Sequence, residues 1–209
     1  MKVMLIHGLT ASVEWWESTI EALRPHHDVE VLEVPRLRIP EAAESLAERL
    51  QNAAAQPTAL IGHSSGGATA VLAAVAASTA VKRLALIAPA GVFATRSRLA
   101  FAAPLTRQVL HGPSRLPRMI HDTWRVGPWR LWLISSDLLR VDLLPELPGV
   151  RARTLVLWGA DDPLLAPAAG ELFVERIPDA RLVVIPDCGH VPMLDAPEQL
   201  NRELLEFLA

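Results

Sequence analysis

The sequence lacks three features that mark secreted, membrane-bound and nucleic-acid-binding proteins. It has a single cysteine, Cys188, in 209 residues, so no disulfide can form within the chain. Its most apolar stretch, residues 68–77, is far too short to cross a membrane. The net charge is −3, so there is no excess of positive charge to attract nucleic acid or anionic lipid. These absences predict a soluble, cytoplasmic protein with no nucleic-acid partner and no membrane insertion.

Strands and helices are expected to alternate along most of the chain. Hydrophobic residues make up 51% of the sequence and charged residues 21%, which suits the core of one globular domain. Strands are predicted at residues 3–6, 29–34, 58–61, 83–88, 154–158 and 181–185, and helices at 13–23, 41–55, 68–77, 167–176 and 197–208. Asp195 is placed to cap the last helix, with Glu198 three residues later. This alternation predicts an α/β fold in which helices surround a mostly parallel sheet of about six strands.

The regular alternation stops between the fourth and fifth predicted strands. The segment is rich in proline and has short amphipathic pieces, which predicts a mainly helical cap at 93–148 inserted into a core made of 1–92 and 149–209. The region has eight arginines and four acidic residues, a net charge of +4, which leaves −7 for the rest of the chain. These arginines could attract an anionic substrate or pair with the acidic core. Three cap tryptophans, Trp124, Trp129 and Trp132, could line a substrate entrance or anchor the cap.

A sharp turn with a central serine joins the third predicted strand to an apolar helix. Its sequence is Gly62-His63-Ser64-Ser65-Gly66. A nucleophile on such a turn needs small residues two positions before and after it, because larger side chains there would collide. Ser65 is a poor alternative nucleophile, since His63 would then occupy a position that must be small. The turn has no G-x-G-x-x-G pattern and no lysine after the glycines, which argues against a nucleotide-binding turn.

Two later motifs complete a resemblance to the α/β-hydrolase superfamily. Residues 157–163, Leu-Trp-Gly-Ala-Asp-Asp-Pro, resemble the stretch in which that family carries its acid. Residues 189–192, Gly-His-Val-Pro, resemble the segment that carries its histidine. The resemblance implies the α/β-hydrolase fold, with Ser64 as nucleophile, His190 as general base and Asp162 as the acid that orients it. Asp161 is the alternative carboxylate.

The early segment His7-Gly8-Leu9 resembles the family's oxyanion loop. The resemblance implies that the backbone N–H groups of Leu9 and Ser65 hold the oxyanion, and that His7 braces the loop. The chain departs from the family in having Ala11 where a glycine is common. It also lacks the usual D-x-x-G-x-G-x-S run, and residues 35–40 stand in its place.

Together these features predict hydrolysis of a small-molecule carboxylic ester through an acyl-enzyme. The alternatives are a thioesterase, lactonase, carbon–carbon bond hydrolase, lyase or perhydrolase that uses the same residues, or a non-catalytic ligand receptor on a hydrolase scaffold. No cofactor is expected, and no metal, because the histidines form no spaced set with cysteines or carboxylates. Cys188 is expected to be a small buried hydrophobe, and the protein a monomer or homodimer. The candidate substrate pocket comprises His7, Trp16, His63, Trp124, Trp129 and Trp132.

Overall fold

The computed structural model describes residues 1–9, 11–32, 38–53, 56–92 and 116–209. Its six strands form one sheet in the order β2-β1-β3-β4-β5-β6, and every neighbouring pair is parallel. The strands are β1 (Lys2–Ile6), β2 (Asp28–Leu32), β3 (Thr58–His63), β4 (Val81–Ile87), β5 (Arg153–Gly159) and β6 (Ala180–Ile185). This confirms the predicted parallel sheet. The last two residues of the predicted strand 29–34 lie outside the described residues.

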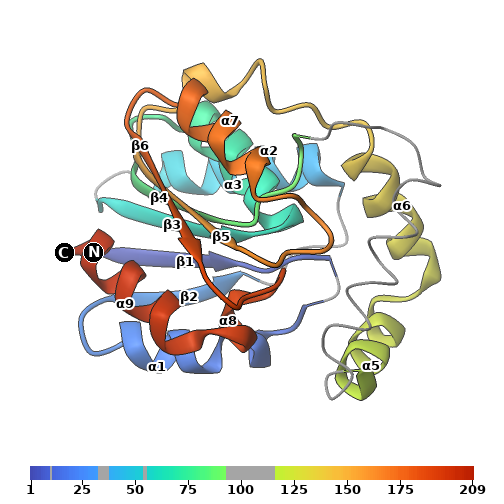
Figure 1. The fold of residues 1–209 in the computed structure, drawn as a ribbon. Helices are drawn as coiled ribbons and strands as arrows, with labels where there is room; N and C mark the ends of the chain where they lie inside the picture. The colour runs from blue at the N-terminus through green and yellow to red at the C-terminus, as the bar shows by residue number, and fades with distance from the viewer. Residues whose placement is uncertain (10, 33–37, 54–55, 93–115) are drawn as a thin grey trace.

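Helices cover both faces of the sheet (Figure 1). One face is covered by α1 (Glu17–Leu23) and α9 (Pro197–Leu208), and the other by α2 (Ile39–Asn52), α3 (Ser65–Ala76) and α7 (Ala168–Arg176). Shorter helices are η1 (Val13–Trp16), η3 (Leu147–Gly149) and α8 (Pro192–Asp195). Successive strand side chains point to opposite faces, so Met4 and Ile6 belong to one apolar cluster and Val3 and Leu5 to the other. The central strands are therefore buried on both sides, as their apolar sequences predict.

The carboxyl ends of the strands meet at one edge of the sheet. Ile6 at the end of β1 pairs with Gly62 of β3, and His63 pairs with Ile87 of β4. Gly159 at the end of β5 pairs with Ile185 of β6. The loops that follow these strands therefore lie side by side, which is where open parallel sheets place their sites.

Two helices lie beyond this carboxyl edge, outside the layers that cover the sheet. They are α5 (Leu116–Val126) and α6 (Pro128–Leu138), and Figure 1 shows them at the end of the molecule opposite the two chain termini. They belong to the segment predicted as a cap, of which residues 93–115 lie outside the described residues. Within the described ranges, no helix is both long and apolar enough to cross a membrane.

The predicted N-cap of the last helix is wrong. Helix α9 begins at Pro197 with Ala196 in the cap position, whereas Asp195 ends the short helix α8. The Asp195 carboxylate instead accepts a hydrogen bond from the N–H of Gly189, at 3.0 Å. A contact with a neighbouring loop therefore takes the place of the local cap, and it holds the loop that carries His190.

Candidate active site

Ser64 occupies a strained turn between β3 and α3. Its backbone has φ 53° and ψ −118°, a conformation that is costly for any residue with a side chain. The glycines around it leave no room for a Cβ atom. A Cβ on Gly66 would lie 2.4 Å from the carbonyl oxygen of Ile6, and one on Gly62 would lie 2.5 Å from that of Gly66. Close backbone packing therefore requires glycine at both positions. It places Ser64 at the carboxyl edge of the sheet.

Ser64, His190 and Asp162 are joined in a chain of hydrogen bonds. The Oγ of Ser64 lies 3.2 Å from Nε2 of His190, and Nδ1 of His190 lies 2.7 Å from Oδ2 of Asp162. The side chains of His190 and Asp162 are 6% and 0% exposed. An ionised carboxylate can only accept, so Nδ1–H donates to Asp162 and Nε2 is left to accept the hydroxyl proton of Ser64. In this geometry a histidine can act as base toward a serine.

Asp162 is held in place by the backbone that follows it. Its Oδ1 accepts hydrogen bonds from the N–H groups of Leu164 at 2.8 Å and Leu165 at 2.9 Å. These two bonds turn Oδ2 toward His190. The neighbouring Asp161 is exposed to solvent, and its backbone N–H donates to the carbonyl of Cys188. Of the two carboxylates weighed from sequence, the structure brings Asp162 to the histidine.

The loop after β1 and the start of α3 present backbone N–H groups near Ser64. Within the described ranges, no residue accepts a hydrogen bond from the N–H of Leu9 or of Ser65. The N–H of Ser65 belongs to the first turn of α3, where helices leave such donors unpaired. His7 donates from Nδ1 to the carbonyl of Gly8 at 2.9 Å, a contact consistent with the predicted bracing of this loop. Both N–H groups thus lack a described acceptor, as donors to an oxyanion must.

His63 links the serine turn to the histidine loop. Its Nε2–H donates to the backbone carbonyl of His190 at 2.9 Å, and the two rings lie 5.1 Å apart. Burial, together with the nearby His190, lowers the pKa of His63 to about 3, so its ring stays neutral at ordinary pH. Its Nδ1 is buried and has no partner among the described residues. His63 was predicted to belong to the substrate pocket, but it does not line the pocket described below and instead contacts His190.

This buried neutral histidine predicts a pH-dependent loss of stability. The unfolded chain takes up a proton on His63 below its ordinary pKa of 6.5, whereas the folded protein does not until about pH 3. The contribution of neutral His63 to the free energy of unfolding is therefore complete above pH 6.5 and is lost as the pH falls toward 3. We expect the unfolding free energy of the wild type to fall by roughly 1 kcal/mol more per pH unit than that of His63→Gln. Urea titrations between pH 7 and 4.5 test this, and equal slopes would contradict it.

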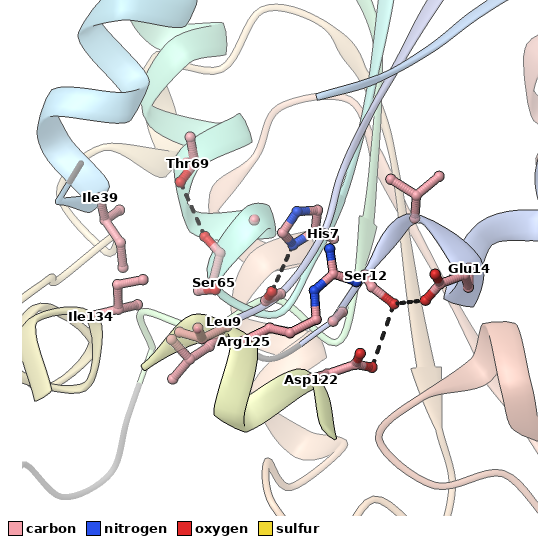
Figure 2. Close-up of a pocket in the computed structure, with 15 residues that line it drawn as sticks. His7, Leu9, Ser12, Glu14, Ile39, Ser65, Thr69, Asp122, Arg125 and Ile134 are labelled. Carbon is pink, nitrogen blue, oxygen red and sulfur yellow. Dashed lines mark hydrogen bonds between the residues drawn. The ribbon is translucent and has the colours of Figure 1, made fainter. Parts of the chain in front are cut away.

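A pocket of about 230 Å³ opens between the sheet edge and the two outer helices (Figure 2). Its core side is formed by the 7–9 loop and Ser65, and its outer side by side chains of α5 and α6, including Arg125 and Ile134. Ligand pockets commonly span about 300–1,000 Å³, so this one suits a small ligand. Leu9, Ser65 and Gly66 line the pocket, whereas Ser64 and His190 do not, so the pocket adjoins the serine turn.

Of the predicted pocket residues, His7 lines this pocket and the tryptophans do not. Trp16 is fully buried in the core between the sheet and α1, where it packs with apolar neighbours. Trp124, Trp129 and Trp132 are 85%, 67% and 50% exposed, and the last two stack on each other. They lie on the parts of α5 and α6 that face away from the described core. Hydrophobicity alone did not indicate which face of each helix would turn inward.

Two aspartates that sequence reasoning missed attach the outer helices to the core. Asp122 of α5 accepts a hydrogen bond from Trp15 Nε1 at 2.9 Å. Asp137 of α6 accepts from Arg38 Nε at 2.9 Å and from the backbone N–H of Ile39 at 3.2 Å. Both carboxylates are buried, with side chains 3% exposed. The sequence feature that could have indicated them is that they are two of the few acidic residues in an arginine-rich segment.

Two further predictions concern metal binding and the thiol of Cys188. Within the residues described, no group of three or more His, Cys, Asp or Glu side chains is arranged to hold a metal ion. Cys188 is fully buried in the apolar cluster on the α1–α9 face, where a small hydrophobe was expected.

Comparison with known proteins relates the chain to a large group of enzymes. A sequence model of the alpha/beta hydrolase family matches residues 3–203. The dihydrolipoyllysine-residue acetyltransferase component of the acetoin cleaving system of Pseudomonas putida is 28% identical over 99% of this chain and 63% of its own length. A 2-hydroxy-6-oxo-6-phenylhexa-2,4-dienoate hydrolase of Burkholderia cepacia is 41% identical over 32% of this chain and 24% of its own. The chain thus spans less than two thirds of these two curated relatives.

The fold is also found in solved structures. The structure of a thermophilic esterase from Thermogutta terrifontis superposes with a TM-score of 0.81. The match covers 100% of this chain and 89% of that one at 21% identity. At this identity the likeness supports a common fold.

Proposed function

This chain belongs to the alpha/beta hydrolase family, and on that basis we propose that it is a serine hydrolase that cleaves a carboxylic ester of a small molecule. The observation that carries the proposal is the hydrogen-bonded chain from Ser64 through His190 to Asp162. Ser64 is the nucleophile, His190 the general base and Asp162 the acid that orients it. Helices α5 and α6 belong to the predicted cap, which covers this site.

The first half of the reaction forms an acyl-enzyme. Nε2 of His190 takes the proton from Ser64 while Oγ attacks the ester carbonyl carbon. The carbonyl oxygen becomes negatively charged and is stabilised by the N–H groups of Leu9 and Ser65. The tetrahedral intermediate then collapses, and His190 gives its proton to the departing alcohol. Asp162 stabilises the imidazolium and keeps its Nδ1 protonated throughout.

The second half of the reaction releases the acid. Water attacks the acyl group on Ser64 while His190 takes its proton, and the same two N–H groups hold the second oxyanion. When this intermediate collapses, the bond to Oγ of Ser64 breaks and His190 returns the proton to Oγ. The pocket volume of about 230 Å³ favours a short acyl group over a long fatty chain. The reaction needs no cofactor. A cytoplasmic location and a monomeric or homodimeric state remain predictions from sequence.

A second candidate function uses the same residues on a different bond. The similarity to a 2-hydroxy-6-oxo-6-phenylhexa-2,4-dienoate hydrolase, confined to about a third of this chain, favours hydrolysis of such a dienoate as the alternative. Fold and triad do not separate the two reactions, because one scaffold supports many chemistries. The choice therefore depends on a direct comparison of substrates.

Hydrolysis of p-nitrophenyl esters of increasing acyl length tests the proposal. We expect turnover that is highest with short acyl chains and that falls at least about 10⁴-fold in Ser64→Ala. Ser45→Ala, which changes an exposed serine of α2, serves as the matched control and should keep the wild-type rate. If folded wild-type protein hydrolyses no ester in the series, the ester proposal is wrong. The dienoate would then be assayed, and ligand binding without any turnover would favour a receptor.

A further inference from the structure

One basic side chain in the pocket has no described partner. Arg125 of α5 lines the pocket, and Figure 2 shows its guanidinium extending toward the loop that carries His7 and Ser12. No described residue forms an ion pair or a hydrogen bond with it. The neighbouring segment 93–115 contains four arginines and no Asp or Glu, so its sequence offers no carboxylate either. A guanidinium that borders a pocket with its donors unpaired is suited to bind an anion.

The two carboxylates that border the same pocket are engaged by other groups. Asp122 lies one helical turn from Arg125, and its Oδ2 accepts from Trp15 Nε1 at 2.9 Å and from Ser12 Oγ at 3.4 Å. Glu14 Oε2 accepts from Ser12 Oγ at 2.6 Å. Neither acid comes within ion-pair distance of Arg125. Asp122 attaches α5 to the core and Glu14 bonds to Ser12, so neither carboxylate neutralises the guanidinium of Arg125.

The charges of the predicted cap also leave Arg125 without an acidic partner among the described residues. The cap has a net charge of +4, and two of its four acids, Asp122 and Asp137, are buried in the contacts that attach it to the core. Arg125 and Arg140 are the cap arginines with described side chains, and neither pairs with an acid of the core. Among the described side chains, an ion pair between the two parts joins a core arginine, Arg38, to Asp137. These two arginines therefore do not neutralise acids of the core.

From these observations we propose that Arg125 selects substrates whose ester carries a carboxylate at its far end. This inference rests on the proposed hydrolase function and names the substrate class. The scissile carbonyl lies against the N–H groups of Leu9 and Ser65, and the apolar chain crosses the pocket past Ile39 and Ile134. The distal carboxylate then meets the guanidinium of Arg125, which can donate two parallel hydrogen bonds to it. The substrate is thus a monoester of a short dicarboxylic acid.

Matched ester pairs test the selectivity. Monomethyl esters of glutaric, adipic and pimelic acid are compared with methyl esters of the unsubstituted acids of equal chain length. We expect wild-type kcat/KM to favour a carboxylate-bearing ester, and Arg125→Met to lower that preference by about 10- to 100-fold. Arg125→Lys should retain part of it, since lysine keeps the charge without the planar pair of donors. Arg140→Met changes a cap arginine outside the pocket and should keep the wild-type preference.

Binding to an inactive protein separates this inference from the hydrolase proposal. Ser64→Ala should bind the preferred monoester in calorimetry, more weakly at high salt, and the double variant Ser64→Ala/Arg125→Met should not. Such binding without wild-type turnover would overturn the proposed reaction and leave the anion site standing. A preference unchanged by Arg125→Met, or equal binding by both inactive variants, would overturn the anion site alone.

Discussion

Asp162→Asn should lower kcat about 10⁴-fold while the protein stays folded. The amide has nearly the shape of the carboxylate, but its two ends differ. Leu164 and Leu165 both donate backbone N–H groups to Oδ1, so the side-chain oxygen of the asparagine must face them. Its NH₂ group then points at Nδ1 of His190, which lies 2.7 Å from Oδ2 in the native protein. The structure therefore dictates the direction in which the amide is oriented.

The consequence is a histidine in the wrong tautomer. Nδ1 must accept from the amide, so the ring proton moves to Nε2, the atom that faces Ser64. A protonated Nε2 cannot take the serine proton, and the base is lost although every heavy atom stays in place. Steady-state ester kinetics measure the loss, and circular dichroism checks the fold.

Asp161→Asn is the matched control for this prediction. It makes the same chemical change one residue earlier, at an exposed carboxylate that does not contact His190. We expect it to keep kcat within about twofold of the wild type, as surface changes usually do. An Asp162→Asn enzyme that retains more than a tenth of wild-type kcat would show that Asp162 does not set the tautomer.

Gly66→Ala should destabilise the fold and abolish activity together. The added Cβ would lie 2.4 Å from the carbonyl oxygen of Ile6 and 2.6 Å from that of His7. Both atoms belong to the backbone at the end of β1, so no side chain can rotate away to make room. We expect a cost of about 3 kcal/mol or more, which lowers Tm by about 6–12 °C in a chain of this size. Any protein that folds would have its 7–9 loop displaced from Ser65.

Gly149→Ala provides the comparison for Gly66. Its Cβ would meet a Cγ atom of Val75 at 3.2 Å, a side-chain atom that can shift by a few tenths of an ångström. Thermal denaturation of both variants, with ester turnover measured below Tm, separates the two cases. Equal and small shifts in Tm would mean that the serine turn can accommodate a Cβ atom at residue 66, contrary to the close contacts in the structure.

Much of the fold, and the residues that meet at the candidate site, could be predicted from local sequence. Fully apolar runs such as β3 must be buried on both faces, and the serine turn needs glycines at fixed offsets, so both leave a clear signal. Asp162 could not be separated from Asp161 by composition. The difference arises from two backbone N–H groups, those of Leu164 and Leu165, which fix one carboxylate and not the other.

The parts that escaped prediction depend on contacts between distant segments. The bond from His63 to the carbonyl of His190 joins residues 127 positions apart, and Trp15 reaches Asp122 across 107 positions. No local periodicity encodes such pairs. For the same reason the exposed positions of Trp124 and Trp129 were not foreseen, because amphipathic pieces show that a face is apolar but not which partner covers it.

Covalent labelling of the nucleophile tests the central claim most directly. Wild-type protein is treated with a fluorophosphonate, which phosphonylates serines activated by a histidine base, and the adduct is located by peptide mass spectrometry. The account predicts one adduct, on Ser64, that is absent in Ser64→Ala and strongly slowed in Asp162→Asn. An adduct on another residue, or a folded wild-type protein that is not labelled, would contradict the assignment of Ser64 as an activated nucleophile.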